Sequence, residues 1–198
     1  MVSFTLNGKK VSSTLDVMTP LRDVLYSMGL NSVRDSDDRE GFAGSDCIIF
    51  NDEVRASNLI PLFMAEGAEI FTAESLIKDR KINDVQRAMV AAGVVQSAYN
   101  SPTVALILTH LLAHKSDATR EDVKDALSSV FIRDAGYEHF YLAVKLVQEE
   151  RATGSYQTPV SPSFRPNLDV IGKPTGKIDG DSLVRGEKVF VEDKVMPG

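Results

Sequence analysis

Residues 38–58 read DREGFAGSDCIIFNDEVRASN, a charged loop that runs directly into an apolar segment. The loop carries Gly41 and Gly44 among acidic and basic residues, and glycine is the residue that best permits tight backbone turns. Residues 47–50 form an apolar run of strand length, followed by an Asn-Asp turn and a second short strand. The stretch therefore predicts a tight loop that leads into a strand of a buried core.

The segments on either side of this stretch extend the same pattern. Residues 2–6 alternate apolar and polar side chains, and Asn7-Gly8 then leads into residues 9–15, which is a strong signal for a β-hairpin. Residues 21–28 place their apolar side chains on one helical face, and residues 69–72 give a last strand. A hairpin, a helix and further strands together predict the α+β fold class.

Beyond residue 82 the apolar spacing becomes helical. Asn83 or Asp84 is placed to cap the first helix, and Thr119 with Asp122 resembles a capping box for the third. Pro102 lies at a first-turn position, where its missing N–H costs nothing. Four helices with short connections predict a small helical bundle. We expect the helices over residues 82–93, 101–114, 119–127 and 137–150.

The composition changes again after Arg151. Residues 154–166 are rich in proline, serine and threonine, which predicts an extended linker without a core of its own. We therefore divide the chain into an α+β domain (1–75), a four-helix bundle (76–153) and an extended C-terminal tail (154–198).

Composition limits the classes of function. The chain has 198 residues, of which 43% are hydrophobic and 25% charged, as in ordinary globular proteins. Its net charge of −6 argues against nucleic-acid binding, which depends on clustered lysine and arginine. The apolar runs are shorter than the roughly 20 residues of a membrane span. A single cysteine and the lack of a signal-peptide pattern favour a cytoplasmic protein.

The loop also has the spacing of a plant-type iron–sulfur loop, C-x4-C-x2-C with a fourth cysteine downstream, without the cysteines. The corresponding positions hold Asp38, Ala43 and Asp46, with the fourth near Asn58. On these residues the chain resembles the small iron–sulfur subunit, or N-terminal domain, of the xanthine dehydrogenase family of molybdenum hydroxylases. It is especially similar to a bacterial branch of probable hypoxanthine oxidases, in which a cysteine-poor domain is fused to a molybdenum domain.

Two further family motifs are matched without their cysteines. The motif Q-C-G-Y-C-x-P corresponds to residues 96–102, QSAYNSP, so Ser97 and Asn100 replace two thiolates. The motif C-R-C-T-G-Y corresponds to residues 132–137, IRDAGY, so Ile132 and Asp134 replace two more. We expect the polar replacements to close the vacated space with hydrogen bonds.

The resemblance implies a β-grasp, ferredoxin-like domain followed by a bundle of the [2Fe–2S]-binding type. It also implies that Gln96 contacts the pterin of a molybdenum cofactor held by a large partner domain or subunit of the same enzyme. Residues 170–198 are similar to the opening of that large domain. We expect no catalytic residue and no bound cofactor in this chain itself. The molybdenum cofactor is expected on the partner.

Other candidate ligands favour simpler interpretations. Asp38 and Asp46 lie in a loop that also holds arginines, which predicts a self-paired charged loop without a metal ion. Cys47 lies inside an apolar strand and is predicted to be a buried structural cysteine. His110 and His114 share a helix face but lack the metalloprotease motif, so they are predicted to be packing or surface residues.

We therefore expect a cluster-less, vestigial iron–sulfur domain that serves a molybdenum hydroxylase acting on purines or similar heterocycles. A freestanding interaction module is one alternative, because a fold does not fix a function. A [2Fe–2S] electron-transfer subunit with unusual ligands is another. A homodimer is a further expectation.

Overall fold

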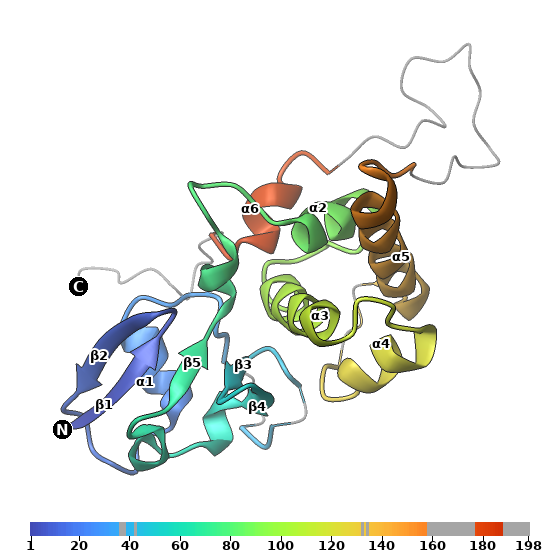
Figure 1. Cartoon of the computed structure of the whole chain (residues 1–198). Coiled ribbons are helices and arrows are strands. Elements are labelled where there is room, and N and C mark those ends of the chain that lie inside the picture. Colours follow the sequence, from blue (N-terminus) through green and yellow to red (C-terminus); the bar gives the residue numbers. More distant parts are fainter. Residues whose placement is uncertain (36–38, 42, 132, 134, 158–176, 188–198) are drawn as a thin grey trace, which may run out of the picture.

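The computed structural model describes residues 1–35, 39–41, 43–131, 133, 135–157 and 177–187 (Figure 1). A sheet with one helix packed against it forms the sheet part of the molecule, made of β1 to β5 and α1. The helices α2 to α6 form the helical part beside it. The mixed content confirms the predicted α+β class.

The sheet has five strands in the order β2-β1-β5-β3-β4. β1 runs parallel to β5, and the other neighbouring strands are antiparallel. β1 and β5 are neighbours in the sheet although they lie far apart in sequence. The chain between them forms β2 at one edge of the sheet, and β3 and the other edge strand β4 on the opposite side of β5. The strands are β1 (Val2–Leu6), β2 (Lys9–Ser13), β3 (Cys47–Phe50), β4 (Glu53–Ala56) and β5 (Glu69–Phe71).

Both hairpins close through two-residue turns of the predicted kind. Asn7 and Gly8 have φ values of 50° and 79°, and Asn51 and Asp52 have 48° and 66°. Positive φ at both central residues defines the turn whose twist matches that of the flanking strands, and asparagine, aspartate and glycine adopt it most easily. The second turn holds Asp52 at the tip of the β3–β4 hairpin.

Helix α1 (Leu21–Ser27) buries the apolar face that its sequence predicts. Leu21, Val24 and Leu25 are fully buried against the sheet. The helix ends before Gly29, whose φ of +88° is the left-handed conformation that commonly terminates helices. Three short 3₁₀ helices complete the sheet part: η1 (Ser57–Leu59), η2 (Leu62–Ala65) and η3 (Ala73–Leu76).

The four predicted helices are present in the helical part. Asn83 and Gln86 form a capping box at the start of α2, and Thr119 and Asp122 form one at the start of α4. Each box satisfies backbone N–H groups that have no partner within the helix. The helices are α2 (Asp84–Ala91), α3 (Ser101–His114), α4 (Arg120–Ala126) and α5 (Tyr137–Thr153).

The prediction of an extended tail is wrong for one segment. Residues Gly180–Val184 form helix α6, which packs beside α2 and α3 (Figure 1). Leu183 and Val184 are buried there, and the buried Gln86 side chain donates a hydrogen bond to the Val184 carbonyl at 3.2 Å. A five-residue helix has too little local signal to predict, because its stability comes from this packing. The other expected tail segments, 158–176 and 188–198, lie outside the described residues.

Each part has its own core, and the two cores meet at strand β3. Ile48 packs into the core of the sheet part, whereas its neighbour Cys47 packs into the core of the helical part. Alternate strand residues face opposite sides of a sheet, so a single strand serves both cores. A smaller cluster of Ile49, Ala73 and Leu106 lies between them.

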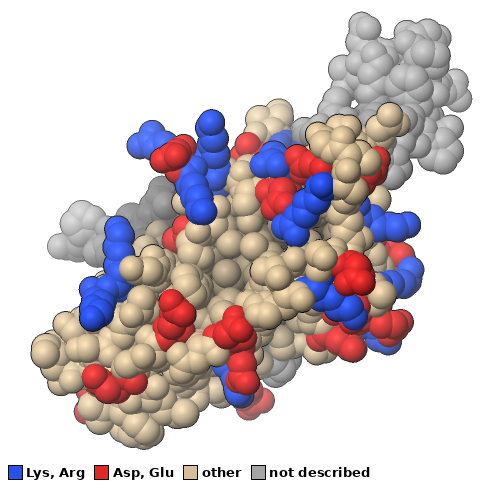
Figure 2. All heavy atoms as spheres, viewed as in Figure 1, with Lys and Arg blue, Asp and Glu red and all other residues tan. Residues whose placement is uncertain are grey.

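Acidic and basic side chains are interspersed over the face of the helical part that Figure 2 shows, and neither sign forms a continuous stripe on that face. No helix in the described ranges is both long enough and apolar enough to cross a membrane.

Candidate functional site

The loop that aligns with the first iron–sulfur motif is closed by protein groups. Asp46 is fully buried, and its Oδ2 accepts a hydrogen bond from the Asn58 backbone N–H at 2.8 Å. The Ser57 hydroxyl donates to the Asp46 carbonyl oxygen at 2.7 Å. Two positions that align with cluster ligands are thus bonded directly to each other. Asp38, at a third such position, lies outside the described residues.

Arginines and acids are paired where this loop passes helix α1. The Arg39 guanidinium lies 2.9 Å from Asp35 and 3.5 Å from Asp23. The hydrogen bond to Asp35, followed by the charge of Asp23, raises the pKa of Arg39. Arg22 also lies 3.7 Å from Asp35. Asp23 and Asp35 therefore face arginines, and this arrangement does not favour a cation between them.

The turn that aligns with the second motif is tied to the same loop. The Ser97 hydroxyl accepts a hydrogen bond from the Tyr99 backbone N–H at 3.3 Å, and Asn100 lies directly before helix α3. The Tyr99 hydroxyl donates to the carbonyl of Asp35 in the first loop. Ile132 and Asp134 lie outside the described residues, so the predicted hydrogen bonds across this space stay a prediction.

The glycine-bearing loop forms a close contact between the sheet part and the helical part. A Cβ added to Gly44 would lie 2.3 Å from the Ser129 carbonyl oxygen and 2.7 Å from Val130 Cα. The Phe131 N–H donates to the Ala43 carbonyl at 3.1 Å. The Thr103 hydroxyl donates to the Ser45 carbonyl at 2.9 Å, also in the interior. The loop therefore holds the two parts together through its own backbone.

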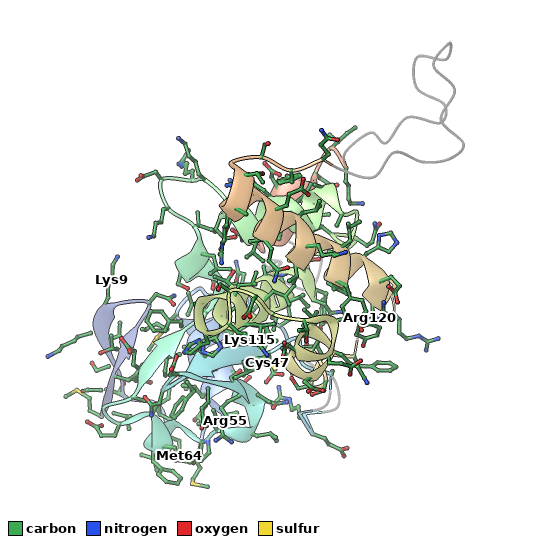
Figure 3. The ribbon with its side chains drawn as sticks, turned by 45° about the vertical axis from the view of Figure 1, so that its right-hand side comes forward. Lys9, Cys47, Arg55, Met64, Lys115 and Arg120 are labelled. Carbon is green, nitrogen blue, oxygen red and sulfur yellow. The ribbon has the colours of Figure 1, made fainter. Side chains whose placement is uncertain are left out.

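Cys47 is the buried structural cysteine that the sequence predicts. Its side chain is 3% exposed, and it lies near the middle of the molecule where the sheet meets the helices (Figure 3). Burial, together with the neighbouring Asp46 charge, raises the pKa of the Cys47 thiol to about 12. A thiol with such a pKa is a poor metal ligand, because the thiolate is the ligating form.

These residues do not fit a [2Fe–2S] cluster. Such a cluster requires about four thiolate ligands or close substitutes. Ala43 has no donor atom, Asp46 and Asn58 are hydrogen-bonded to each other, and the chain holds one cysteine in total.

Gln96 lies in the connection between α2 and α3 and is exposed. Its Nε2 donates a hydrogen bond to the Gly93 carbonyl at 2.8 Å. This position at the surface is accessible to a partner. A contact with a cofactor there stays a prediction.

The structure also brings together one set of residues that the sequence does not assemble. His110 and His114 on α3 both contact Asp52, in the turn between β3 and β4. The sequence shows the histidine pair as an i, i+4 spacing; His110 is partly buried in the structure and His114 is exposed. Asp52 was visible only as a turn residue, because it lies 58 positions from His110 in the chain.

Comparison with known proteins shows which protein family this chain is related to. Residues 72–145 match the family described as [2Fe-2S] binding domain. The chain is homologous to the iron–sulfur domains of xanthine dehydrogenase-type molybdenum hydroxylases, as its sequence motifs predict.

Individual relatives make this more specific. The chain is 43% identical over 195 residues to the probable hypoxanthine oxidase XdhD of Escherichia coli K12, covering 98% of this chain and 20% of the relative. It is 28% identical over 139 residues to the xanthine dehydrogenase iron-sulfur-binding subunit of Escherichia coli O157:H7, covering 69% of this chain and 87% of the subunit. The chain thus spans about a fifth of the first of these relatives.

A solved structure shows the same fold. The aldehyde oxidoreductase of Desulfovibrio desulfuricans superposes with a TM-score of 0.84 at 22% identity, over 97% of this chain and 22% of the enzyme. At this identity the likeness concerns the fold alone.

Proposed function

We propose that this chain is a cluster-less iron–sulfur domain that serves as a structural and docking part of a molybdenum hydroxylase. In this proposal residues 1–75 form the β-grasp domain, 76–153 the four-helix bundle and 154–198 the tail, with α6 folded back onto the bundle. The observation that carries the proposal is the bond between Asp46 and Asn58, because it fills ligand positions with a contact that needs no cluster. Electron transfer through this chain is therefore not part of its proposed role.

The proposed partner is the molybdenum-cofactor domain or subunit of the same enzyme. Support comes from the length of the relative XdhD, of which this chain matches 20%. The substrate class follows from that relative's description as a probable hypoxanthine oxidase, so we propose a purine or a similar heterocycle. Homodimerisation of the assembled enzyme, and a cytoplasmic location, stay predictions.

An apolar surface on the sheet part supports docking. Met18, Phe63 and Met64 are each more than half exposed, at 65%, 51% and 54%. Phe63 is joined to the segment before Met18 by a hydrogen bond from its N–H to the Val17 carbonyl at 3.0 Å. Leu59, 57% exposed, lines the same cleft as Met64. Exposed apolar side chains gathered in this way are typical of protein interfaces.

The test of the cluster-less state is iron analysis with a visible spectrum on protein purified without oxygen. We expect no stoichiometric iron and no absorption from thiolate-to-iron charge transfer. About two to four irons per chain with such bands would disprove the proposal, because the ligands would have to come from residues that this sequence does not offer.

The test of docking is co-purification with the molybdenum-cofactor domain of a xanthine dehydrogenase-type enzyme. Phe63→Asp is expected to reduce the retained complex strongly, whereas the matched control Lys9→Asp, on exposed strand β2, should leave it intact. Equal retention of both variants would show that this apolar surface is not the interface. Failure of the wild-type chain to bind the domain at all would instead favour a freestanding interaction module.

The proposed contact of Gln96 with the pterin requires the assembled enzyme. Gln96→Ala is expected to lower activity without loss of the complex, because its exposed side chain makes a local bond only to Gly93 within the described chain. Unchanged activity and unchanged cofactor content would remove Gln96 from the site.

A further inference from the structure

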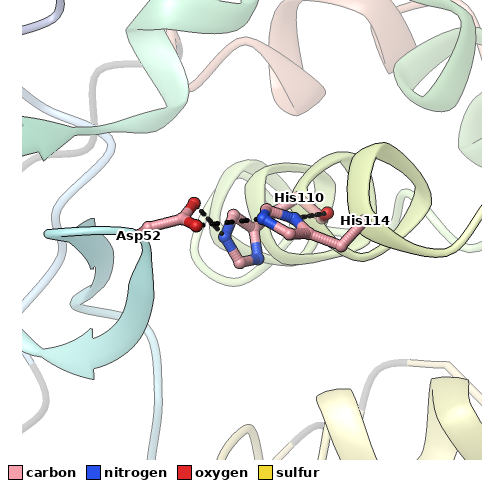
Figure 4. Close-up of side chains that lie close together, drawn as sticks. All are labelled: Asp52, His110 and His114. Carbon is pink, nitrogen blue, oxygen red and sulfur yellow. Dashed lines mark hydrogen bonds and ion pairs between the residues drawn. The ribbon is translucent and has the colours of Figure 1, made fainter.

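Three potential ligands converge where helix α3 passes the tip of the β3–β4 hairpin (Figure 4). His110 Nε2 lies 3.1 Å from Asp52 Oδ1, and His114 Nε2 lies 3.0 Å from Asp52 Oδ2. The two imidazole rings lie next to each other at a centroid distance of 4.3 Å, with their planes tilted by 42°. The ligand atoms of all three residues lie within 4.8 Å of one another.

Local structure fixes all three side chains. The i, i+4 spacing places His110 and His114 on the same face of α3, one turn apart. The two-residue turn, with Asp52 at a φ of 66°, directs its carboxylate toward that helix (Figure 4). The site is open to solvent on one side, since the side chains of His110 and Asp52 are 21% and 72% exposed.

The hydrogen bonds identify which ring nitrogen is available. His114 Nδ1–H donates to the His110 carbonyl at 3.0 Å, so its Nε2 is the atom that faces Asp52. When the His114 ring is neutral, its Nε2 therefore presents a lone pair to a carboxylate oxygen, and this contact is favourable only with a cation between the two atoms. A proton on His114 Nε2 can supply that charge, and so can a metal ion that both histidines bind.

We propose that Asp52, His110 and His114 bind a divalent transition-metal ion of the zinc class. Imidazole nitrogen with one carboxylate oxygen is a ligand set that suits zinc, copper or nickel and not calcium or magnesium, which prefer oxygen ligands. Zinc bonds of about 2.0–2.1 Å in tetrahedral geometry separate neighbouring ligand atoms by roughly 3.4 Å. The observed nitrogen–oxygen separations of 3.0 and 3.1 Å need only a small side-chain movement to reach this value.

The proposed ion would join the two parts of the molecule. Asp52 belongs to the sheet part and the histidines to the helical part, so the metal would clamp the hairpin to α3. Three protein ligands leave a fourth position for water. This site is separate from the vacated iron–sulfur positions and shares no residue with them, so it stands or falls independently of the proposed function.

The experiment uses zinc as the probe on protein without a histidine tag. Calorimetric titration at about pH 7.5 should give one zinc ion per chain. His110→Ala and His114→Ala should each weaken binding about tenfold or more, as should Asp52→Asn, which keeps the shape of the turn residue. His139→Ala is the matched control, because this third histidine lies on α5 and contacts the Ala92 carbonyl.

A second measurement separates metal binding from folding. At a free zinc concentration of about one hundred times Kd, the melting temperature of the wild type should rise by about 5–10 °C, and that of His114→Ala should not. Circular dichroism without zinc should be the same for all variants, since the side chains are at the surface. Absence of saturable zinc binding, or binding that survives loss of both His110 and His114, would overturn the proposal.

Discussion

The close contact at Gly44 gives the sharpest test of how the loop around this residue holds the sheet part and the helical part together. Gly44 has a φ of +74°, and a Cβ at this position would lie 2.3 Å from the Ser129 carbonyl oxygen and 2.7 Å from Val130 Cα. Both atoms are backbone and cannot move aside by a change of rotamer. Gly44→Ala should therefore strain its own backbone and push the loop away from the helical part.

The size of the effect follows from these two contributions. An L-residue in the left-handed region costs about 1–2 kcal/mol. Overpacking against fixed neighbours costs about 1–3 kcal/mol more. Gly29→Ala supplies the matched control, because Gly29 has a similar φ of +88° but nothing within 4 Å of its added Cβ. We therefore expect Gly44→Ala to lower the free energy of unfolding by about 1–3 kcal/mol more than Gly29→Ala does.

The assay is equilibrium unfolding in urea, followed by circular dichroism, for the wild type and both variants. Hydrogen exchange at the Phe131 amide provides a local readout, because that N–H donates to the Ala43 carbonyl next to Gly44. Exchange there should quicken in Gly44→Ala and stay unchanged in Gly29→Ala. Equal destabilisation by the two substitutions would refute the idea that this loop is packed tightly against the helical part.

Three further predictions concern single side chains. The pKa of the Cys47 thiol is raised to about 12, so at about pH 8 only roughly one folded molecule in ten thousand carries the thiolate. Cys47 should therefore react with a thiol reagent only after the protein unfolds. Labelling of the folded protein at the rate of a free thiol would contradict this. Gln86→Ala removes the side-chain oxygen that accepts a hydrogen bond from the Asn83 N–H and the amide that donates to the Val184 carbonyl of α6. It should cost about 1–3 kcal/mol in urea unfolding, whereas exposed Gln96→Ala should cost almost nothing; equal effects would argue against that role. The hydrogen bond from Lys115 is the main reason that the pKa of Asp122 is lowered in the folded protein. The ionised carboxylate therefore stabilises the fold at pH values above the unfolded pKa of about 3.9. This stabilisation is lost as the pH falls through the lower pKa of the folded state. Melting of Asp122→Asn against the wild type should therefore differ most at neutral pH and converge in acid, and a gap that is constant with pH would refute the argument.

The sequence predicted the regular elements because their signals are local. Alternating side chains and an Asn-Gly pair specify the first hairpin within a dozen residues, and the boxes at Asn83 and Thr119 mark helix starts within one turn. The burial of Cys47 was likewise readable from its apolar neighbours. The family also followed from motifs that are contiguous in the chain, and the comparisons confirm it.

Contacts between distant segments were decided only by the tertiary structure. Helix α6 is too short to be stable alone, and it exists because α2 and α3 bury Leu183 and Val184. The Asp46 carboxylate meets the Asn58 N–H only because the loop returns along the sheet.

The convergence of Asp52 with the two histidines shows the same limit at a candidate site. The spacing of His110 and His114 is written in the sequence, since a helix brings residues four apart onto one face. The third member is set by how the β3–β4 hairpin packs beside α3, which depends on the cores of both parts. The sequence by itself thus determined the elements and the family, whereas the packing of one part on the other decided which side chains meet, because no local pattern encodes a distance across the fold.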